Sequence, residues 1–196
     1  MDITFTTRFG TITFNKERDE KMRASFETGG HQNEDIDILL PYARGGIVVD
    51  VGAHIGTISV PLASVAKKVY AFEPVAESAK YLRKNITDNH LTNIEVYELA
   101  VGAHEGHVSM ITNKAHNHAG TQVSGVGDIP MRPLDSFHLA PTLIKIDTDG
   151  FEPEVLEGAA DTIATYKPVV FFEFFMPQIR AKSVLGHLAL LCRLSI

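Results

Sequence analysis

The sequence predicts an α/β domain built on a doubly wound, mostly parallel sheet. Short apolar runs rich in β-branched residues alternate with segments in which apolar residues recur every three or four positions, as they do on a helix face. The runs lack the polar alternation of a half-exposed sheet, so both of their faces are expected to be covered. The first run also leads into a glycine-spaced turn, at residues 50–56, from which a helix starts.

The first quarter of the chain is expected to precede the sheet. Residues 3–14 alternate apolar and polar side chains, which predicts a short hairpin. Residues 16–30 are polar and are expected to form a surface loop. Asn33 is a suitable N-cap for a helix that ends within residues 41–46 and leads into the first strand of the sheet.

The rest of the chain repeats a strand and helix unit, whose crossovers are almost always right-handed. The expected strands are residues 47–51, 68–72, 94–97, 143–146 and 169–175, and the expected helices are residues 58–66, 74–89, 152–166 and 181–190. Before the fourth strand, an insertion is expected to hold short strands at residues 108–111 and 129–134. A loop at residues 112–127, long enough to be functional, would separate them.

Length and composition limit the class of protein. The 196 residues fit one domain, which we place at residues 34–196. It follows an N-terminal hairpin or flap at residues 1–33. Cys192 is the single cysteine, so an intrachain disulfide and a cysteine-based zinc site are excluded. The amino terminus lacks a signal peptide and no apolar run approaches the ~20 residues of a membrane span, so we expect a cytoplasmic protein without a membrane partner.

The net charge and its distribution indicate which classes of partner to expect. Eighteen basic and 24 acidic residues give a net charge of −6, and no window concentrates lysine and arginine. Because proteins that track nucleic acid carry basic patches, we expect no nucleic-acid partner.

Carboxylates end four of the predicted strands, and in a doubly wound sheet the ligand lies outside those carboxyl ends. Asp50 ends the first strand and Glu73 the second, about 20 residues beyond the glycine turn, where an acid can accept hydrogen bonds from ribose hydroxyls. The turn is neither Gly-x-Gly-x-x-Gly nor a phosphate loop, which disfavours NAD and ATP. Asp50 would instead attract an ammonium group such as that of S-adenosylmethionine, or else cap the following helix.

Successive blocks of the sequence resemble those of the FkbM-family methyltransferases over roughly residues 34–175. These blocks are Val49-Asp50-Val51-Gly52-Ala53-His54-Ile55-Gly56, Val69-Tyr70-Ala71-Phe72-Glu73-Pro74, Ala100-Val101-Gly102, Pro133-Leu134-Asp135-Ser136-Phe137 and Ile144-Lys145-Ile146-Asp147-Thr148-Asp149-Gly150-Phe151-Glu152. The resemblance implies a Rossmann-like class I methyltransferase fold that binds S-adenosylmethionine and methylates a hydroxyl of a carbohydrate or other small metabolite.

The same resemblance implies roles for cofactor-binding residues. The turn that includes Gly52, Ala53, His54 and Gly56 would hold the methionine part of the cofactor. Glu73 would bind the ribose, the backbone near Ala100 would bind the adenine, and Phe72 would supply an apolar wall.

Methyl transfer to a hydroxyl needs a general base. Asp147 is the first candidate, although it could equally bind the ammonium group of the cofactor. Asp149 and Glu152 are further candidates, or stabilise the start of a helix. Glu173, within an apolar strand, could be an acid, a base or a substrate contact. His116 and His118 are expected in a substrate loop, where His118 could also serve as the base, and no metal site is expected.

Three departures from the FkbM pattern leave alternatives open. Asp149 stands where the family commonly has glutamate, and His54 where it commonly has asparagine. The chain ends 21 residues after Phe175, which predicts a truncated C-terminal strand pair and an exposed edge through which a homo-oligomer could form. The leading function is O-methylation of a small-molecule or glycan acceptor. The alternatives are a non-catalytic S-adenosylmethionine-binding or assembly subunit and an NAD-dependent oxidoreductase.

Overall fold

The computed structural model describes residues 1–17, 19–29, 31–112, 121–174 and 188–192. Its central sheet has the strand order β11-β10-β9-β3-β4-β5. All neighbouring strands in it run parallel except β10 and β11, so the predicted doubly wound, mostly parallel sheet is confirmed. The strands are β3 (Ile47–Val51), β4 (Lys68–Phe72), β5 (Ile94–Tyr97), β9 (Leu143–Ile146), β10 (Val169–Phe174) and β11 (Leu188–Cys192).

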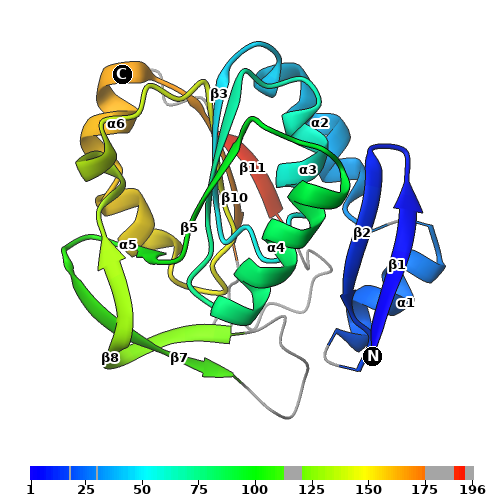
Figure 1. Ribbon diagram of the computed structural model, residues 1–196. Helices are drawn as coiled ribbons and strands as arrows, with labels where there is room; N and C mark the ends of the chain where they lie inside the picture. The colour runs from blue at the N-terminus through cyan, green and yellow to red at the C-terminus, as the bar shows by residue number, and fades with distance from the viewer. Residues whose placement is uncertain (18, 30, 113–120, 175–187, 193–196) are drawn as a thin grey trace, which may run out of the picture.

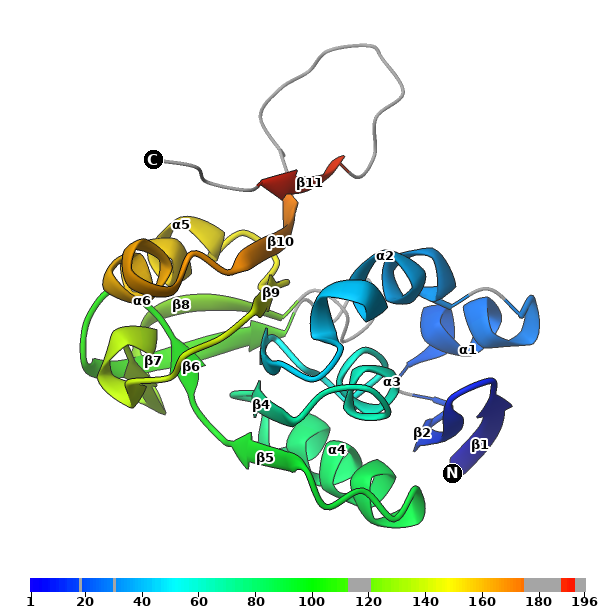
Figure 2. The same cartoon turned by 90° about the horizontal axis from the view of Figure 1, so that it is seen from above.

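Helices cover both faces of this sheet (Figures 1 and 2). One face carries α2 (Asn33–Ala43), α3 (Ser59–Ala63) and α4 (Ala76–Asp88), and the other carries the 3-10 helix η1 (Leu134–Phe137), α5 (Glu152–Glu157) and α6 (Ala160–Tyr166). Successive residues of β3 alternate between the two faces, as strand geometry requires. Val48 packs in the cluster with α2 and α3, whereas Val49 and Val51 pack in the cluster with η1 and α5.

The order of the strands creates a crevice between β3 and β9. From β3 the chain proceeds to β4 and β5 on one side of the sheet, and it later returns to add β9 and β10 on the other side. The connection after β3 therefore runs to α3 on one face, while the connection after β9 runs to α5 on the opposite face. Ligands of doubly wound proteins bind at such a point, outside the carboxyl ends of the strands.

The N-terminal segment is packed against the rest of the chain. Strands β1 (Asp2–Thr7) and β2 (Gly10–Asn15) form the predicted hairpin, which lies beside α4 (Figure 1). The buried Asn85 of α4 accepts a hydrogen bond from the backbone N–H of Thr13 at 2.8 Å and donates one to its carbonyl at 3.1 Å. The surface loop predicted at residues 16–30 is wrong, because α1 (Glu20–Glu27) lies there with Met22 in the core.

The insertion before β9 also differs from the prediction. β6 (Ala100–Val101), β7 (Gly106–Thr112) and β8 (Thr121–Arg132) form a second sheet, in which β8 already begins within the loop predicted at residues 112–127. An alternating hydrophobic pattern is absent from Thr121–Gly127, and this part of the strand is recognisable only from its pairing with β7.

Two helix boundaries differ for identifiable reasons. The helix predicted at residues 152–166 is divided between α5 and α6 near Gly158, where an added Cβ would collide with the carbonyl of Gly102. The helix predicted at residues 181–190 is wrong at its end, since Leu188–Cys192 is strand β11. Residues 181–187 lie outside the described part of the chain. Antiparallel pairing with β10 overrides the helical spacing of the apolar residues there.

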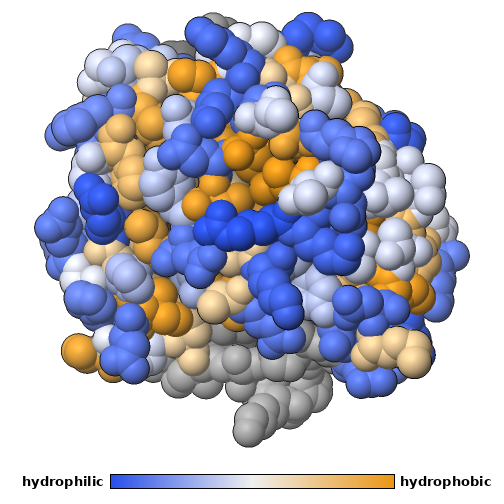
Figure 3. Space-filling view, viewed as in Figure 1, coloured by the Kyte–Doolittle hydropathy of each residue, from blue (hydrophilic) through white to orange (hydrophobic). Residues whose placement is uncertain are grey.

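The surface seen from the side of Figure 1 carries hydrophilic side chains around several apolar areas, one of them near the centre of the view (Figure 3). In the residues that the structure describes, we find no helix whose length and apolar character would allow it to cross a membrane. Homo-oligomer formation through a sheet edge, and the division at residue 33, remain predictions.

Candidate cofactor and active site

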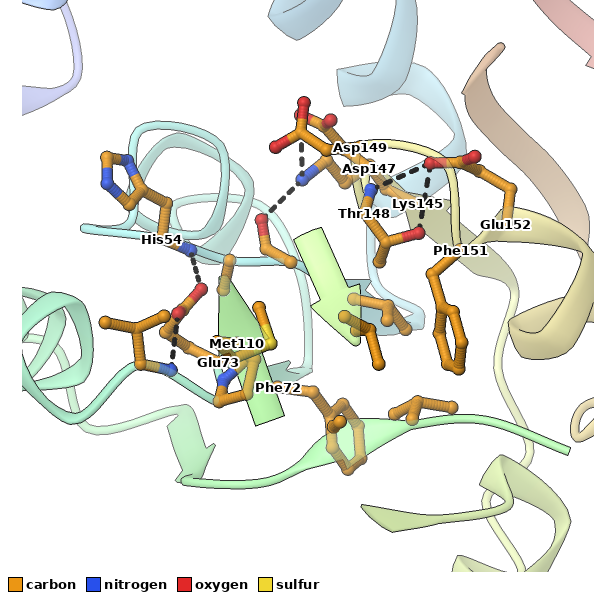
Figure 4. Close-up of a pocket in the computed structure, with 18 of the residues that line it drawn as sticks. His54, Phe72, Glu73, Met110, Lys145, Asp147, Thr148, Asp149, Phe151 and Glu152 are labelled. Atoms are coloured by element: carbon orange, nitrogen blue, oxygen red, sulfur yellow. Dashed lines mark hydrogen bonds and ion pairs between the residues drawn. The ribbon is translucent and has the colours of Figure 1, made fainter. Parts of the chain in front are cut away.

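A cavity of about 560 Å³ lies at the carboxyl ends of β3, β4 and β9. Its walls come from the turn after β3, the end of β4, the segment at residues 99–101, and the turn between β9 and α5. Figure 4 shows how side chains from these separate segments converge. The strand order therefore brings together residues that lie about 100 positions apart in the sequence, and the crevice predicted from the sheet topology contains a site large enough for a small ligand.

The glycine turn after β3 is shaped by close backbone contacts. Gly52 has φ +78, and an added Cβ would collide with the backbone carbonyl oxygen of Asp147. The backbone N–H groups of Gly52 and Ala53 both donate to the carbonyl of Phe72 at 3.0 Å, which ties the turn to the end of β4. Gly56 has φ +92 and lies against α4, because an added Cβ would approach Leu82 Cδ1 to 2.7 Å. Gly52 therefore lines the cavity, whereas Gly56 serves helix packing.

Glu73 is the carboxylate that joins the turn to β4. Its Oε2 accepts the backbone N–H of His54 and its Oε1 accepts that of Val75, both at 2.8 Å (Figure 4). Glu73 is 5% exposed. Burial raises the pKa of Glu73 to about 7, against the opposing effect of the two backbone N–H donors. Glu73 consequently titrates near neutral pH, and each of its oxygens keeps a further lone pair for a ligand hydroxyl.

Lys145 is a charged residue of the site that was not predicted from the sequence. It stands opposite Asp50 in the parallel ladder of β3 and β9, on the same face of the sheet. Its Nζ donates to the carbonyl of Gly52 at 2.9 Å and lies 3.0 Å from Asp50 Oδ1 and 3.7 Å from Asp147 Oδ2. Burial opposes the charge of Lys145, but the two carboxylates outweigh it and raise the Lys145 pKa. The sequence feature that could have identified Lys145 is its place in a strand with both faces covered. A buried lysine charge requires carboxylate or carbonyl partners.

Asp50 lies behind the wall of the cavity. It is fully buried, receives a hydrogen bond from the hydroxyl of Ser59 at 2.6 Å and pairs with Lys145. It is not among the residues that line the cavity. The predicted direct contact of Asp50 with an ammonium group is therefore not what this geometry provides, because Lys145 already neutralises the carboxylate. Asp50 instead supports the glycine turn through Lys145, which binds both the Asp50 carboxylate and the carbonyl of Gly52.

The turn between β9 and α5 presents three acidic residues. Glu152 is buried, and its Oε1 accepts hydrogen bonds from the backbone N–H and hydroxyl of Thr148 at 3.0 Å and from the N–H of Gly150 at 3.1 Å. This carboxylate holds its own turn, which is the helix-start role that the sequence left open. Burial, followed by the charges of Asp147 and Glu152, raises the pKa of Asp149 to about 6. Asp147 and Asp149 both line the cavity.

Two segments that the sequence did not connect with the site complete its walls. Met110 of β7 and Val123 of β8 are cross-strand partners that line the cavity. Met110 lies near Glu73 and Phe72 (Figure 4). From the N-terminal segment come Met22, His31 and Gln32. No local pattern predicts these contacts, because they depend on where the hairpin and the insertion pack.

Of the predicted site residues, nine line the cavity: Gly52, Ala53, His54, Phe72, Glu73, Ala100, Asp147, Asp149 and Glu152. Asp50 and Gly56 lie behind its wall. Glu173 belongs to β10, but its side chain lies outside what the structure describes, as do His116 and His118 altogether. The roles of these residues remain predictions.

Two curated proteins are similar to part of the chain. "Probable ribosomal RNA small subunit methyltransferase A" of Methanosphaera stadtmanae is 36% identical over 89 residues, which are 41% of this chain and 33% of that protein. A tRNA (guanine(37)-N(1))-methyltransferase of Heterostelium pallidum is 36% identical over 69 residues, which are 35% of this chain and 16% of that protein. The chain therefore spans a third or less of the length of these relatives.

These similarities correct the expectation about partners. The expected absence of a nucleic-acid partner is wrong as a conclusion from the sequence, since the names of both relatives assign them RNA substrates. Net charge averages over the whole surface, and it therefore does not exclude local contact with a phosphate backbone.

Two solved structures are also similar to the chain. The FkbM methyltransferase of Methylobacillus flagellatus is 25% identical with a TM-score of 0.49, over 66% of this chain and 32% of that one. The "Putative methyltransferase yhhF" of Escherichia coli is 12% identical with a TM-score of 0.50, over 88% of this chain and 81% of that one. The second likeness concerns the fold alone, and it agrees with the Rossmann-like sheet described above.

The family model of the methyltransferase FkbM domain matches residues 50–194. The match begins at Asp50 and includes the glycine turn, Glu73 and the turn at residues 147–152, which are the segments that build the cavity. Because the match extends over well more than half of the sequence, the chain belongs to the FkbM methyltransferase family.

Proposed function

We propose that the chain uses S-adenosylmethionine to methylate a hydroxyl group of a carbohydrate or other small metabolite. The observation that carries this proposal is the junction of Gly52 and Glu73 at the carboxyl ends of β3 and β4. There a close backbone turn meets a buried carboxylate beside a cavity of small-ligand size.

The residues present fit the cofactor that the family implies. The backbone of residues 52–54 would flank the methionine part, and Glu73 would accept hydrogen bonds from the ribose hydroxyls. Phe72 and the segment at residues 99–101 would supply apolar walls for the adenine. Glu73, Asp147, Asp149 and Glu152 outnumber Lys145 among the charged residues that line the cavity, so its charge favours a cationic ligand.

S-adenosylmethionine supplies a methyl group bonded to a positively charged sulfur, and transfer leaves the electron pair of the broken carbon–sulfur bond on that sulfur. The protein must align the acceptor oxygen with the methyl carbon and exclude water. The acceptor oxygen forms the new bond to carbon while its proton passes to a base. We assign the base to Asp149, because it lines the cavity and burial raises its pKa to about 6, which makes it a stronger proton acceptor than an ordinary aspartate. Asp147, which lies beside Lys145, would orient the cofactor or acceptor.

A second candidate acceptor is RNA. The similarity to an rRNA and a tRNA methyltransferase favours it, although each alignment covers less than half of the chain. In that case the same cofactor cavity would serve an acceptor atom presented by a nucleotide.

The test is a transfer assay with radiolabelled S-adenosylmethionine. The panel contains sugars, phenols, glycans, bulk tRNA and bulk rRNA, and Asp149→Asn serves as the inactive comparison. Label in a hydroxyl compound supports the main proposal, and label only in RNA supports the second. Label in no acceptor, despite tight cofactor binding, would favour a non-catalytic subunit.

The affinity for S-adenosylmethionine is expected to rise about tenfold between pH 6 and pH 8, because Glu73 has a pKa of about 7 and only its ionised form attracts the cation fully. Calorimetric titration at the two pH values measures this. Glu73→Gln should flatten the dependence, and Glu77→Gln, at an exposed position on α4, should preserve it. An equally steep dependence in Glu73→Gln would assign the titrating group elsewhere.

The same raised pKa has the opposite effect on the unliganded protein. The folded-state pKa of Glu73 exceeds its ordinary value of 4.5, so the protonated form stabilises the fold at low pH. This contribution is lost as the pH rises from about 4.5 through about 7.

A further inference from the structure

A second cavity, of about 270 Å³, lies between the N-terminal hairpin and helices α2 and α3. Six apolar and six polar residues line it together with Gly29, and three of the apolar residues are phenylalanines. The apolar residues that line it are Phe5, Phe9, Ile12, Phe26, Ile36 and Pro61. Phe26 stacks on Phe5 with the ring centroids 5.2 Å apart, so two of these rings pack face to face. The sequence predicts a hairpin, a surface loop and two helices in this region, but no ligand site.

The second cavity adjoins the cofactor cavity. His31 and Thr57 line both of them and thus form a common wall. The imidazole of His31 stacks on Phe26 at 4.7 Å, and the hydroxyl of Thr57 donates to Oε1 of Gln32 at 2.6 Å. The wall between the cavities therefore includes two polar side chains, which can form hydrogen bonds with a ligand hydroxyl. The aromatic rings next to them can pack against the apolar part of the same ligand.

Three polar side chains around the second cavity, those of Thr7, Arg8 and Asn33, are already engaged within the protein. Thr7 Oγ1 donates to the carbonyl of Gly10 at 2.9 Å and accepts the N–H of Phe9, and Asn33 Nδ2 donates to the carbonyl of Gly29 at 2.9 Å. Arg8 pairs with Asp37 at 2.7 Å. A sugar would bury several hydroxyls against partners that are largely occupied, which costs free energy. An aromatic ring requires no such partners on its faces.

The state of His31 agrees with this arrangement. Burial lowers the pKa of His31 to about 4, so its imidazole is neutral at physiological pH. A neutral ring nitrogen can either donate to a hydroxyl oxygen or accept from a hydroxyl proton, and it does not repel a cationic cofactor in the neighbouring cavity.

We propose that the second cavity binds the aromatic ring of a phenolic methyl acceptor and directs its hydroxyl past His31 and Thr57 toward the cofactor cavity. This inference rests on the proposed function and narrows the acceptor to phenolic compounds. In the transfer step the phenolic oxygen bonds to the methyl carbon, the carbon–sulfur bond breaks with its electrons on sulfur, and the phenolic proton passes to the carboxylate base.

The test titrates 4-methylphenol into protein saturated with S-adenosylhomocysteine and follows isoleucine methyl resonances by NMR. The Ile12 and Ile36 methyl signals are expected to shift, because both residues line the second cavity. Ile163, on the distant helix α6, should not respond. This measurement uses the unaltered chain, so it does not depend on whether a variant folds.

A matched pair of variants on α2 locates the probe. Ile36→Phe places a larger side chain in the second cavity and should weaken 4-methylphenol binding about tenfold or more, with S-adenosylhomocysteine binding unchanged. Ile38→Phe makes the same change on the same helix at a residue that is 43% exposed, and should leave both affinities unchanged.

Four results would overturn the inference: no binding of 4-methylphenol, no shift at Ile12 and Ile36, equal binding by both variants, or the same methyl shifts with glucose instead. Absence of S-adenosylhomocysteine binding would instead contradict the proposed function. The two failures are therefore distinguishable in one titration series.

Discussion

Lys145→Met is expected to lower the free energy of unfolding by about 3 to 5 kcal/mol, the usual cost of removing one partner from a buried ion pair. Asp50 would be left fully buried without its counter-charge, and the carbonyl of Gly52 would lose a donor at 2.9 Å. Because that carbonyl belongs to the glycine turn, cofactor affinity should fall as well.

Urea denaturation of the variant and the unaltered protein measures the first effect. Lys67→Met is the control, since Lys67 is exposed and the same substitution there should change the stability only slightly. The double variant Lys145→Met with Asp50→Asn removes both charges and should recover part of the loss. A loss below about 1 kcal/mol in the single variant would mean that Lys145 is solvated rather than paired.

Gly52→Ala is expected to destabilise the turn by roughly 3 kcal/mol or more and to abolish measurable cofactor binding. Two effects add: the positive φ of +78 is strained for alanine, and the new Cβ would collide with the backbone carbonyl of Asp147. The backbone of Asp147 cannot rotate away from the new Cβ as a flexible side chain could. The ends of β3 and β9 would therefore have to move apart at the cavity.

Gly45→Ala separates these two effects. Gly45 also has a positive φ, of +67, but an added Cβ there meets nothing within 4 Å. It should therefore show the conformational cost alone, about 1 kcal/mol, with cofactor binding retained. Thermal unfolding and calorimetric titration of both variants provide the comparison. Equal losses would show that the contact with Asp147 is unimportant.

The sheet and the cofactor turn could be predicted because their sequence features are local. A β-branched run defines β3 and an apolar, partly aromatic run defines β4, and the glycines of the turn require only short-range steric arguments. The position of Glu73 follows from the same run, because it directly succeeds the last residue of β4. The order of strands in a doubly wound sheet then places the carboxyl ends of these strands next to one another, so no other sequence feature is needed to predict that they are close.

The missing parts depend on contacts that are distant in sequence. Lys145 acquires its partners only when β9 settles beside β3 in the register that sets it opposite Asp50. Asp50 for this reason supports the turn instead of facing a ligand. The cavity wall formed by Met22 and His31 depends similarly on the N-terminal segment. Its helix α1 was predicted as a loop because most of its residues are polar and only Met22 and Phe26 pack in the core cluster.

Glu152 illustrates a residue whose type was informative but whose role was ambiguous. An acid at the start of a helix can act on a ligand or bind its own turn, and sequence spacing is the same for both. Three hydrogen bonds to Thr148 and Gly150 distinguish the two in the folded chain.

S-adenosylmethionine is the ligand that we propose for the cavity at the ends of β3, β4 and β9. Isothermal titration of the unaltered protein with this cofactor at pH 8 measures that binding. We expect saturable binding to one site, which Gly52→Ala abolishes and Gly45→Ala retains. Absence of heat with S-adenosylmethionine and with S-adenosylhomocysteine, together with binding of NAD, would contradict this proposal.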